Sequence, residues 1–245
     1  MCTGCGAELH PYLEDDIYGR WQRWQFPPCR PCDARDQERW QKAERIASLG
    51  LAPRHAGMTF EAYEPVTDSQ RHALERVRAG GSLWLVGLAS KDGPGTGTGK
   101  SHLSVAACIA AAEAGAVHVE YHVAPELYAR LRGEAMSEGM EDTVRDLCEC
   151  DLLVLDDLDK GRKTPLAAEV VYRIAEERSV NGRRTLVTTN SRPGEVAGLF
   201  REGGYGPAIV SRLRGLCDVL TVEGPDHRLT ARPEFPEARK GGTNR

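Results

Sequence analysis

One glycine-rich segment, GPGTGTGKSHLS at residues 93–104, limits the fold of this chain more than any other feature. It follows the apolar run LWLV at 83–86 and leads into a helical pattern that begins at Lys100. Glycines in such a loop let the backbone turn its N–H groups toward phosphate oxygens, while the lysine and serine bind the outer phosphates and Mg²⁺. The segment therefore predicts a phosphate-binding loop, or P-loop. The residues expected to contact the nucleotide are Gly95, Thr96, Gly97, Thr98, Gly99, Lys100, Ser101 and His102.

The loop departs from the pattern G-x-x-x-x-G-K-[ST] at its first position, which falls on Pro94. Gly93 stands one residue earlier, and Gly87 lies at the end of the preceding strand. The connection between strand and cradle is therefore longer than usual, and its effect on nucleotide binding stays open. A glycine-rich surface loop is the alternative, which the flanking strand and helix disfavour.

A second polar feature, DLLVLDD at 151–157, is an apolar strand that ends in two carboxylates. A magnesium site beside a P-loop needs a carboxylate at such a strand end. Asp156 is therefore expected to hold Mg²⁺ together with Ser101, and Asp157 to polarise the attacking water as a general base. A buried strand that reaches solvent at two aspartates is the alternative, and the presence of Lys100 weakens it.

Two more polar side chains extend the predicted site. Asn190 follows the apolar run TLVTT, where its amide could bind the attacking water or the γ-phosphate. Arg212 could reach the ATP of a neighbouring subunit as an arginine finger, with Arg214 as the competing candidate. A turn-forming asparagine and solvated arginines are the alternatives. The chain has no Asn-Lys-x-Asp guanine motif, so ATP is favoured over GTP.

Short apolar runs alternate with helical patterns from Ser82 onward. This alternation predicts an α/β fold with a parallel five-stranded sheet that helices cover on both faces. Thr164 and Pro165 predict the start of one helix, and Asn181-Gly182 its end. The expected domains are a nucleotide-binding domain at 56–223 and a mobile, proline-containing tail at 224–245.

The first 55 residues are expected to form a separate small module. It carries two C-x2-C pairs, Cys2 with Cys5 and Cys29 with Cys32. Two such pairs present four thiolates to a tetrahedral Zn²⁺, and zinc would supply folding free energy to a segment with a meagre core. Unliganded cysteines or a redox pair are the weaker alternatives.

Charge and hydropathy exclude several classes. A formal net charge of −4 argues against a globally basic nucleic-acid coat but leaves room for a local basic strip. No run approaches the roughly 18 apolar residues of a membrane span, and the first residues lack the pattern of a signal peptide. A cytoplasmic protein without membrane contact is expected.

With the order GTGKSHL, LLVLDDL, TLVTTN and SRL, the chain resembles the DnaC/IstB-like branch of AAA+ ATPases, the helicase loaders and transposition helper ATPases. The resemblance covers about residues 56–223. It implies homo-oligomers whose ATP sites lie between subunits. It also implies roles for six residues, namely Lys100 and Ser101 in Walker A, Asp156 and Asp157 in Walker B, Asn190 as sensor 1, and Arg212 as the finger in trans.

The same resemblance implies a contact with single-stranded DNA along residues 123–136. Arg130 and Arg132 would bind phosphates, and Tyr128 would offer a stacking surface. An ordinary amphipathic helix with solvated arginines is the alternative. The chain after Asp218 has too few apolar residues for a helical lid, so a second nucleotide sensor on a lid helix is not expected.

The layout is similar to DnaI-type loaders, in which a zinc-bearing N-terminal domain binds the replicative helicase. Residues 1–56 have eight Lys/Arg and eight Asp/Glu, a balance that favours a protein partner over DNA. The sequence thus predicts an ATP-dependent loader that binds a replicative ring helicase and single-stranded DNA. The alternatives are an IstB-like transposition helper that binds duplex DNA and a transposase, an ATP-dependent switch with negligible turnover, and a small kinase-like P-loop protein.

Overall fold

The structure is a computed structural model, and the residues that it describes are 12–15, 22–25, 41–42, 44–52, 55, 57–89, 95–116, 118–134 and 139–230. The chain divides into two compact units, Met1–Gly50 and Leu51–Arg245. In the first unit, β1 (Tyr12–Asp15) pairs antiparallel with β2 (Gln22–Gln25). The four cysteines of the predicted zinc site and Pro94 lie outside the described residues.

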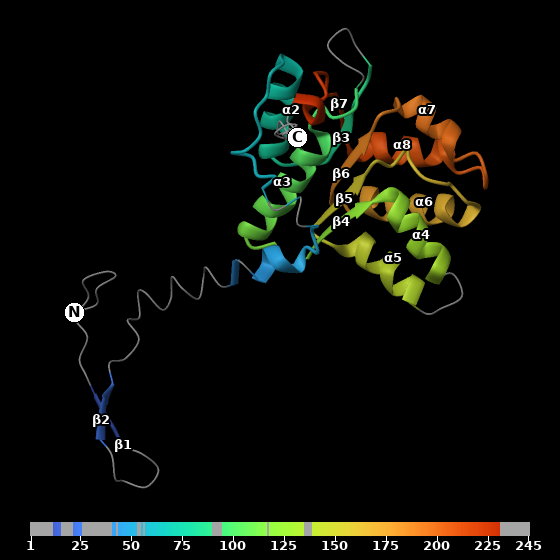
Figure 1. Cartoon of the computed structure of the whole chain (residues 1–245). Helices are drawn as coiled ribbons and strands as arrows, with labels where there is room; N and C mark the ends of the chain where they lie inside the picture. Colours follow the sequence, from blue (N-terminus) through green and yellow to red (C-terminus); the bar gives the residue numbers. More distant parts are fainter. Residues whose placement is uncertain are drawn as a thin grey trace, which may run out of the picture. The chain divides into compact units, whose positions relative to one another are not determined.

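The second unit is built on a five-stranded parallel sheet in the order β4-β5-β6-β3-β7 (Figure 1). The central strands are continuous apolar runs because both faces of a parallel sheet are buried. The sequence-based prediction of an α/β fold with five parallel strands is confirmed. The strands are β3 (Leu83–Val86), β4 (Val119–Val123), β5 (Leu152–Asp156), β6 (Arg184–Thr189) and β7 (Asp218–Thr221).

Helices cover the sheet on both faces. In Figure 1, α2 and α3 lie on one side and α4 to α8 on the other. The helices are α2 (Asp68–Arg78), α3 (Lys100–Glu113), α4 (Ala124–Glu134), α5 (Gly139–Glu149), α6 (Pro165–Val180), α7 (Pro193–Leu199), α8 (Gly206–Leu216) and α9 (His227–Thr230). No helix in the described part of the chain combines the length and apolar character that a membrane span needs.

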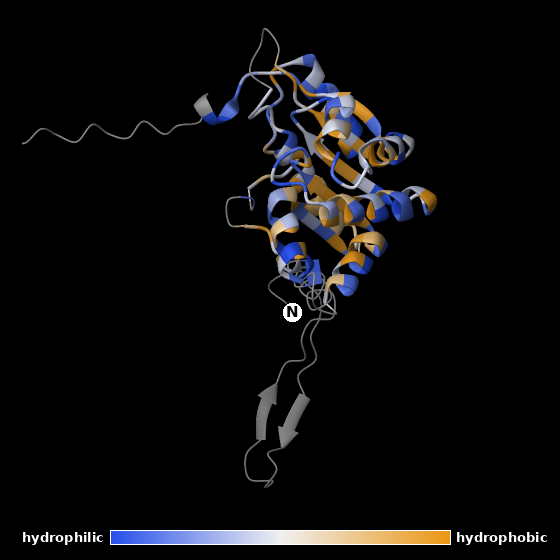
Figure 2. Cartoon of the chain, turned by 90° about the vertical axis from the view of Figure 1, so that its right-hand side faces the viewer, coloured by the Kyte–Doolittle hydropathy of each residue, from blue (hydrophilic) through white to orange (hydrophobic). Residues whose placement is uncertain are grey.

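The main hydrophobic core lies between the sheet and α4 to α8. Trp84, Tyr128 and Phe200 are its largest apolar side chains, and each is fully buried. Figure 2 shows the hydrophobic segments at the centre of this unit and hydrophilic residues on the outer faces of its helices. This packing fixes the strands that carry the polar residues described below.

Local signals explain where α6 begins and ends. The Thr164 side chain accepts a hydrogen bond from the Ala167 N–H at 3.2 Å, Pro165 occupies the first turn, and Asn181 caps the other end. The sequence had predicted both ends. Helix α5 had not been predicted, because its buried face consists only of Thr143, Val144 and Leu147.

The start of the predicted tail makes polar contacts with the rest of the second unit. The Glu223 carbonyl accepts hydrogen bonds from the Thr67 hydroxyl at 2.8 Å and the Ser69 hydroxyl at 3.1 Å. The His227 N–H then donates to the Gly97 carbonyl at 3.1 Å. Polar contacts that composition does not reveal thus tie the start of the predicted tail to the helix α2 region and to the P-loop. The mobility of the tail stays a prediction. Residues 231–245 lie outside the described residues.

Arg178 of α6 is a fully buried cation that ties α5 to β6. Its guanidinium donates to the carbonyl oxygens of Leu147 and Cys150 at 2.9 and 3.0 Å, near the end of α5. It also donates to the Thr185 hydroxyl at 2.8 Å and to the Arg184 carbonyl at 2.5 Å. The positive charge thus satisfies carbonyl groups at a helix C-terminus, where cations are favoured.

Replacing this guanidinium is expected to destabilise the fold. The Arg178→Met variant keeps the apolar stem but leaves several buried carbonyls without donors, each at a cost of roughly 1–3 kcal/mol. We therefore expect the free energy of unfolding to fall by at least ~3 kcal/mol in urea titrations. The matched change of the exposed Arg201, Arg201→Met, should alter it by less than ~0.5 kcal/mol. Equal stabilities of the two variants would contradict this account.

Candidate nucleotide-binding site

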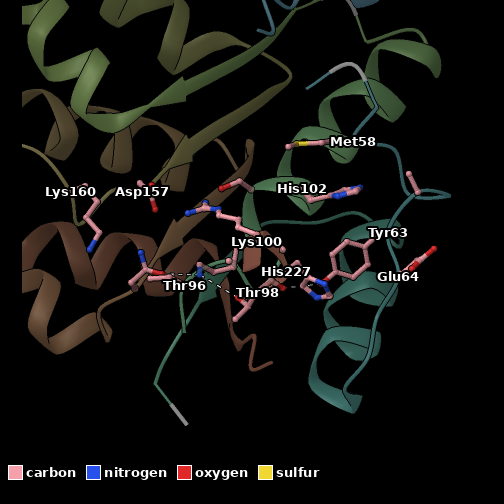
Figure 3. Close-up of a pocket in the computed structure, with 16 residues that line it drawn as sticks. Met58, Tyr63, Glu64, Thr96, Thr98, Lys100, His102, Asp157, Lys160 and His227 are labelled. Carbon is pink, nitrogen blue, oxygen red and sulfur yellow. Dashed lines mark hydrogen bonds between the residues drawn. The ribbon is translucent and has the colours of Figure 1, made fainter. Parts of the chain in front are cut away.

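A cavity of about 500 Å³ lies at the edge of the sheet where β5 and β6 end. Ligands of open α/β sheets bind at the carboxyl ends of strands, and this volume is within the usual range for small-molecule sites. Figure 3 shows Asp157 and Lys160 on one side, Met58, Tyr63 and His102 on the other, and Lys100 between them. The lining residues are Met58, Ala62, Tyr63, Glu64, Thr96, Gly97, Thr98, Gly99, Lys100, Ser101, His102, Asp157, Lys160, Asn190, His227 and Arg228.

The glycines of the loop are required by its backbone and its neighbours. Gly95, Gly97 and Gly99 have φ values of 77°, 66° and 93°, which side chains disfavour. A Cβ on Gly99 would lie 2.5 Å from the Tyr63 ring, and one on Gly97 would lie 1.7 Å from the Asp226 carboxylate. Because α3 starts directly after the loop, its free N–H groups and its dipole favour an anion here.

Lys100 joins the loop to the end of β6. Its ammonium donates to the Gly95 carbonyl at 2.9 Å and to the Asn190 side-chain oxygen at 2.9 Å. Burial lowers the pKa of Lys100, while the carboxylates of Asp157 and Asp156 raise it. The structure thus brings together two residues, 90 positions apart in the sequence, that were both expected in the site.

Asp156 is the centre of a hydrogen-bond cluster at the end of β5. The Ser101 hydroxyl donates to Oδ1 of Asp156 at 3.1 Å, and the Thr188 hydroxyl donates to the same oxygen at 2.6 Å. The Tyr121 hydroxyl donates to Oδ2 at 2.8 Å. A hydroxyl and a carboxylate side by side are oxygen donors of the kind that Mg²⁺ prefers, so the residues fit this ion. The parts played by Tyr121 and Thr188 were not predicted, because only strand pairing places them beside Asp156.

Asp157 lies in a strained turn that faces the cavity. Its φ is 54°, and among the described residues it alone has a positive φ without being glycine. The backbone N–H of Asp157 donates a hydrogen bond to the Thr188 hydroxyl oxygen at 2.8 Å. Burial and the neighbouring Asp156 charge raise the pKa of the Asp157 carboxyl. Backbone strain of this kind is concentrated at functional sites.

The opposite wall of the cavity is aromatic. The rings of Tyr63 and His102 meet edge to face with centroids 5.2 Å apart, and the Tyr63 hydroxyl donates to the Thr98 carbonyl at 3.3 Å. Nε2 of His102 lies 2.8 Å from the Thr59 carbonyl oxygen. The segment before α2 therefore packs against the P-loop and leaves an apolar surface suited to a base.

Sequence reasoning missed two cations of the cavity. Arg228 enters from α9. Its backbone N–H donates to the Asp226 carboxylate at 3.0 Å, and the Thr96 hydroxyl donates to the same carboxylate at 3.4 Å. Lys160 enters from the turn after β5. A lid helix was not expected, and the short α9 brings an arginine to the cavity instead. The polar stretch PDHR carried no periodic signal that could have revealed it.

Arg212 does not reach the cavity of its own chain. It lies on α8, half exposed, and forms an ion pair with Glu176 of α6. Arg214 is exposed on the same helix. The sequence-predicted finger is therefore separate from the other predicted residues in the monomer.

The predicted DNA-contacting helix is only partly suited to that role. Tyr128 is fully buried, and its hydroxyl donates to the Leu158 carbonyl at 3.1 Å. The predicted stacking surface at Tyr128 is thus wrong, because the ring fills the core under α4. Arg130 is exposed and paired with Glu134 at 2.7 Å, and Arg132 is exposed.

Metal ligands of the predicted zinc site, Cys2, Cys5, Cys29 and Cys32, lie outside the described residues. Within the part of the chain that is described, no group of three or more His, Cys, Asp or Glu side chains is arranged to hold a metal ion. Cys108, Cys150 and Cys217 are buried there as free thiols. Burial raises the pKa of the Cys150 thiol to about 11.

A glycine cradle at a helix start, a buried lysine and strand-end carboxylates on a parallel sheet define a P-loop nucleoside triphosphatase. The family model described as IstB-like ATP binding protein matches residues 34–234. The chain belongs to this family, and it is an ATP-binding and ATP-hydrolysing protein.

Three curated relatives are similar to this chain. YdaV of Escherichia coli, an uncharacterised protein, is 28% identical over 188 residues, which are 75% of this chain and 76% of YdaV. The replicative helicase loader DnaC of Escherichia coli is 29% identical over 169 residues, 67% of this chain and 66% of DnaC. A putative ATP-binding protein in an insertion sequence of Mycobacterium tuberculosis is 26% identical over 161 residues, 66% of this chain and 61% of that protein.

Solved structures share the fold. The DnaC helicase loader has a TM-score of 0.57 and 24% identity, over 70% of this chain and 99% of that chain. DnaI has a TM-score of 0.61 and 19% identity, over 75% of this chain and 100% of that chain. DnaA of Aquifex aeolicus, bound to the ATP analogue AMPPCP, has a TM-score of 0.55 and 20% identity, over 67% of this chain and 50% of that chain.

Removal of the Lys100 ammonium is expected to abolish useful nucleotide binding. Lys100→Ala removes a buried cation whose charge-assisted hydrogen bonds to phosphate contribute about 1.5–3 kcal/mol each, so ATP affinity should fall at least ~100-fold. Titration with a fluorescent ATP analogue measures it. Arg162→Ala, an exposed cation outside the cavity, is the control. Retained affinity in Lys100→Ala would contradict the P-loop assignment.

Proposed function

We propose that this protein is an ATP-dependent replicative helicase loader that binds a ring helicase and single-stranded DNA. The observation that carries the proposal is the likeness to DnaC, which combines 29% identity over 169 residues with a shared fold over 99% of the solved DnaC chain. The first unit, Met1–Gly50, lies before the domain that forms the ATP site. A helicase-binding module in front of the ATPase domain is what such a loader needs.

The geometry of the ATP site supports the following proposed roles. Lys100 binds the outer phosphates, and Ser101 with Asp156 holds Mg²⁺, an ion that would neutralise phosphate charge. Asp157 orients the attacking water, and Asn190 faces the terminal phosphate beside Lys100. Arg228 adds a cation from the same chain, a role that its place in the cavity supports.

The N-terminal module is proposed to span residues 1–55 and to hold Zn²⁺ through Cys2, Cys5, Cys29 and Cys32. The proposal rests on the spacing of the two C-x2-C pairs. Zinc would fix the module that contacts the helicase. The ATPase domain is then proposed to span residues 56–223, followed by a C-terminal tail at residues 224–245.

The DNA contact is proposed for the exposed face of α4. Because Tyr128 is buried, this contact would rely on phosphate binding by Arg132 and Arg130 rather than on base stacking. Arg130 would have to exchange Glu134 for a phosphate, and exposed ion pairs of this kind contribute only about 0–1 kcal/mol.

A transposition helper that binds duplex DNA and a transposase is the second candidate. The family description, IstB-like ATP binding protein, and the Mycobacterium tuberculosis relative in an insertion sequence favour it. The ATP site suits both functions, so the two candidates are distinguished by which partner the protein binds.

Capture of the replicative helicase tests the loader proposal. The full chain is expected to co-purify with the helicase of its host, and Cys2→Ser with Cys5→Ser should weaken the capture at least ~10-fold, because it removes two of four proposed zinc ligands. Zinc content of both proteins is measured alongside. Cys148→Ser, outside the module, serves as the control. No capture by the full chain, with or without ATP, would favour the helper and call for a duplex-DNA binding assay.

Mixing two inactive variants tests the finger. Arg212→Ala should bind ATP normally but lose at least ~100-fold in turnover, because finger arginines stabilise the transferring phosphoryl group in a neighbouring subunit. Asp157→Asn should likewise bind without turnover. ATPase activity should return when the two variants are mixed, since one interface then has both intact groups. Arg214→Ala is the matched control, and inactivity of the mixture would contradict action in trans.

A further inference from the structure

Asp159 is a buried carboxylate that the roles above leave unused. It lies in the turn after β5 with a side chain only 1% exposed. Its Oδ2 accepts hydrogen bonds from the Asn190 N–H at 3.1 Å and from the Ser191 hydroxyl at 2.9 Å. Its Oδ1 has no hydrogen-bond partner in the described part of the chain. Burying a charge with half of its acceptors unused is costly, so a simple structural tie is a poor explanation.

Two of the residues that contact Asp159, Asn190 and Lys160, line the nucleotide cavity. Asn190, whose N–H binds Asp159, uses its side-chain oxygen to accept a hydrogen bond from Lys100. Lys160, which also lines the cavity, has its ammonium 3.6 Å from Oδ2 of Asp159. Asp159 itself does not line the cavity, so it acts on the site from behind these two residues.

The two groups lie at the phosphate end of the cavity. The lysine of a P-loop reaches the β- and γ-phosphates, and Lys100 touches Asn190. Lys160 and Asp157 lie on the wall opposite the aromatic residues Tyr63 and His102 (Figure 3). A nucleotide that places its base against the aromatic wall therefore directs its terminal phosphate toward Asn190 and Lys160.

We propose that Asp159 is a positioning residue that holds Asn190 and Lys160 for contact with the γ-phosphate and so makes the site distinguish ATP from ADP. The inference rests on the proposed role of Asn190. The Lys160 ammonium lies 3.6 Å from Oδ2 of Asp159, which is an ion-pair distance rather than a hydrogen bond, and Oδ2 keeps its hydrogen bonds from Asn190 and Ser191. The ammonium can therefore move toward the phosphate without breaking a hydrogen bond. Lys160 is half exposed, so this movement needs no change in the core.

The test compares nucleotides with and without the γ-phosphate. Asp159→Asn keeps an oxygen that can accept from Asn190 and Ser191 but removes the charge that attracts Lys160, and Lys160→Met removes the cation itself. We expect each variant to bind AMPPCP about 10-fold more weakly, with ADP affinity changed less than twofold, and to lower kcat about 10-fold. Arg162→Ala changes an exposed neighbour outside the cavity and should show the wild-type affinities and kcat.

Three results decide the matter. Selective loss of AMPPCP binding and of kcat supports the positioning role. If Asp159 only stabilised the fold, its replacement would weaken the binding of both ADP and AMPPCP and would lower the unfolding temperature. An equal loss of affinity for ADP and AMPPCP, or no loss of affinity in either variant, overturns the positioning role. If Asp159→Asn does not fold, Lys160→Met gives the same comparison at a half-exposed residue. The assay contains no helicase and no DNA, so its outcome is independent of whether the loader proposal holds.

Discussion

The hydrogen bond from the Lys100 ammonium to the Asn190 side chain is the contact on which the site depends. It joins the start of α3 to the end of β6, and it places a buried cation where the phosphates of a nucleotide are expected. The bond forms because β3 and β6 are neighbours in the sheet, with Val86 opposite Thr189. The loops that follow these two strands therefore meet.

A second cluster, around Asp156, depends on the order of the strands in the sheet. Tyr121 of β4, Thr188 of β6 and Ser101 of α3 all donate to its carboxylate. These hydroxyls fix the carboxylate on three sides while its strand is buried, so one oxygen-rich point remains beside the P-loop for Mg²⁺. The strand order β4-β5-β6-β3 is what makes this convergence possible.

The turn after β5 links the ATP site to α4. Tyr128 donates to the Leu158 carbonyl, and the Lys163 ammonium lies 5.7 Å and 5.8 Å from the centroids of the Tyr128 and Phe200 rings. Burial lowers the pKa of Lys163 to about 8. Tyr128, which was expected to stack on DNA, instead holds this turn through its hydrogen bond to Leu158. The proposed contact between α4 and DNA would lie on a helix that packs directly against the turn after β5.

Local sequence determined the P-loop, the strand-end carboxylates, the ends of α6 and the α/β class, because each depends on residues close together in the chain. It also pointed to Lys100, Ser101, Asp156, Asp157 and Asn190, which the structure places around one cavity or next to it. Only the tertiary structure decided that Tyr128 is buried, that Arg228 and Lys160 enter the cavity, and that Asp159 holds Asn190. These depend on strand order and on polar contacts between distant segments, such as the one between Glu223 and Thr67, which leave no periodic pattern in the sequence.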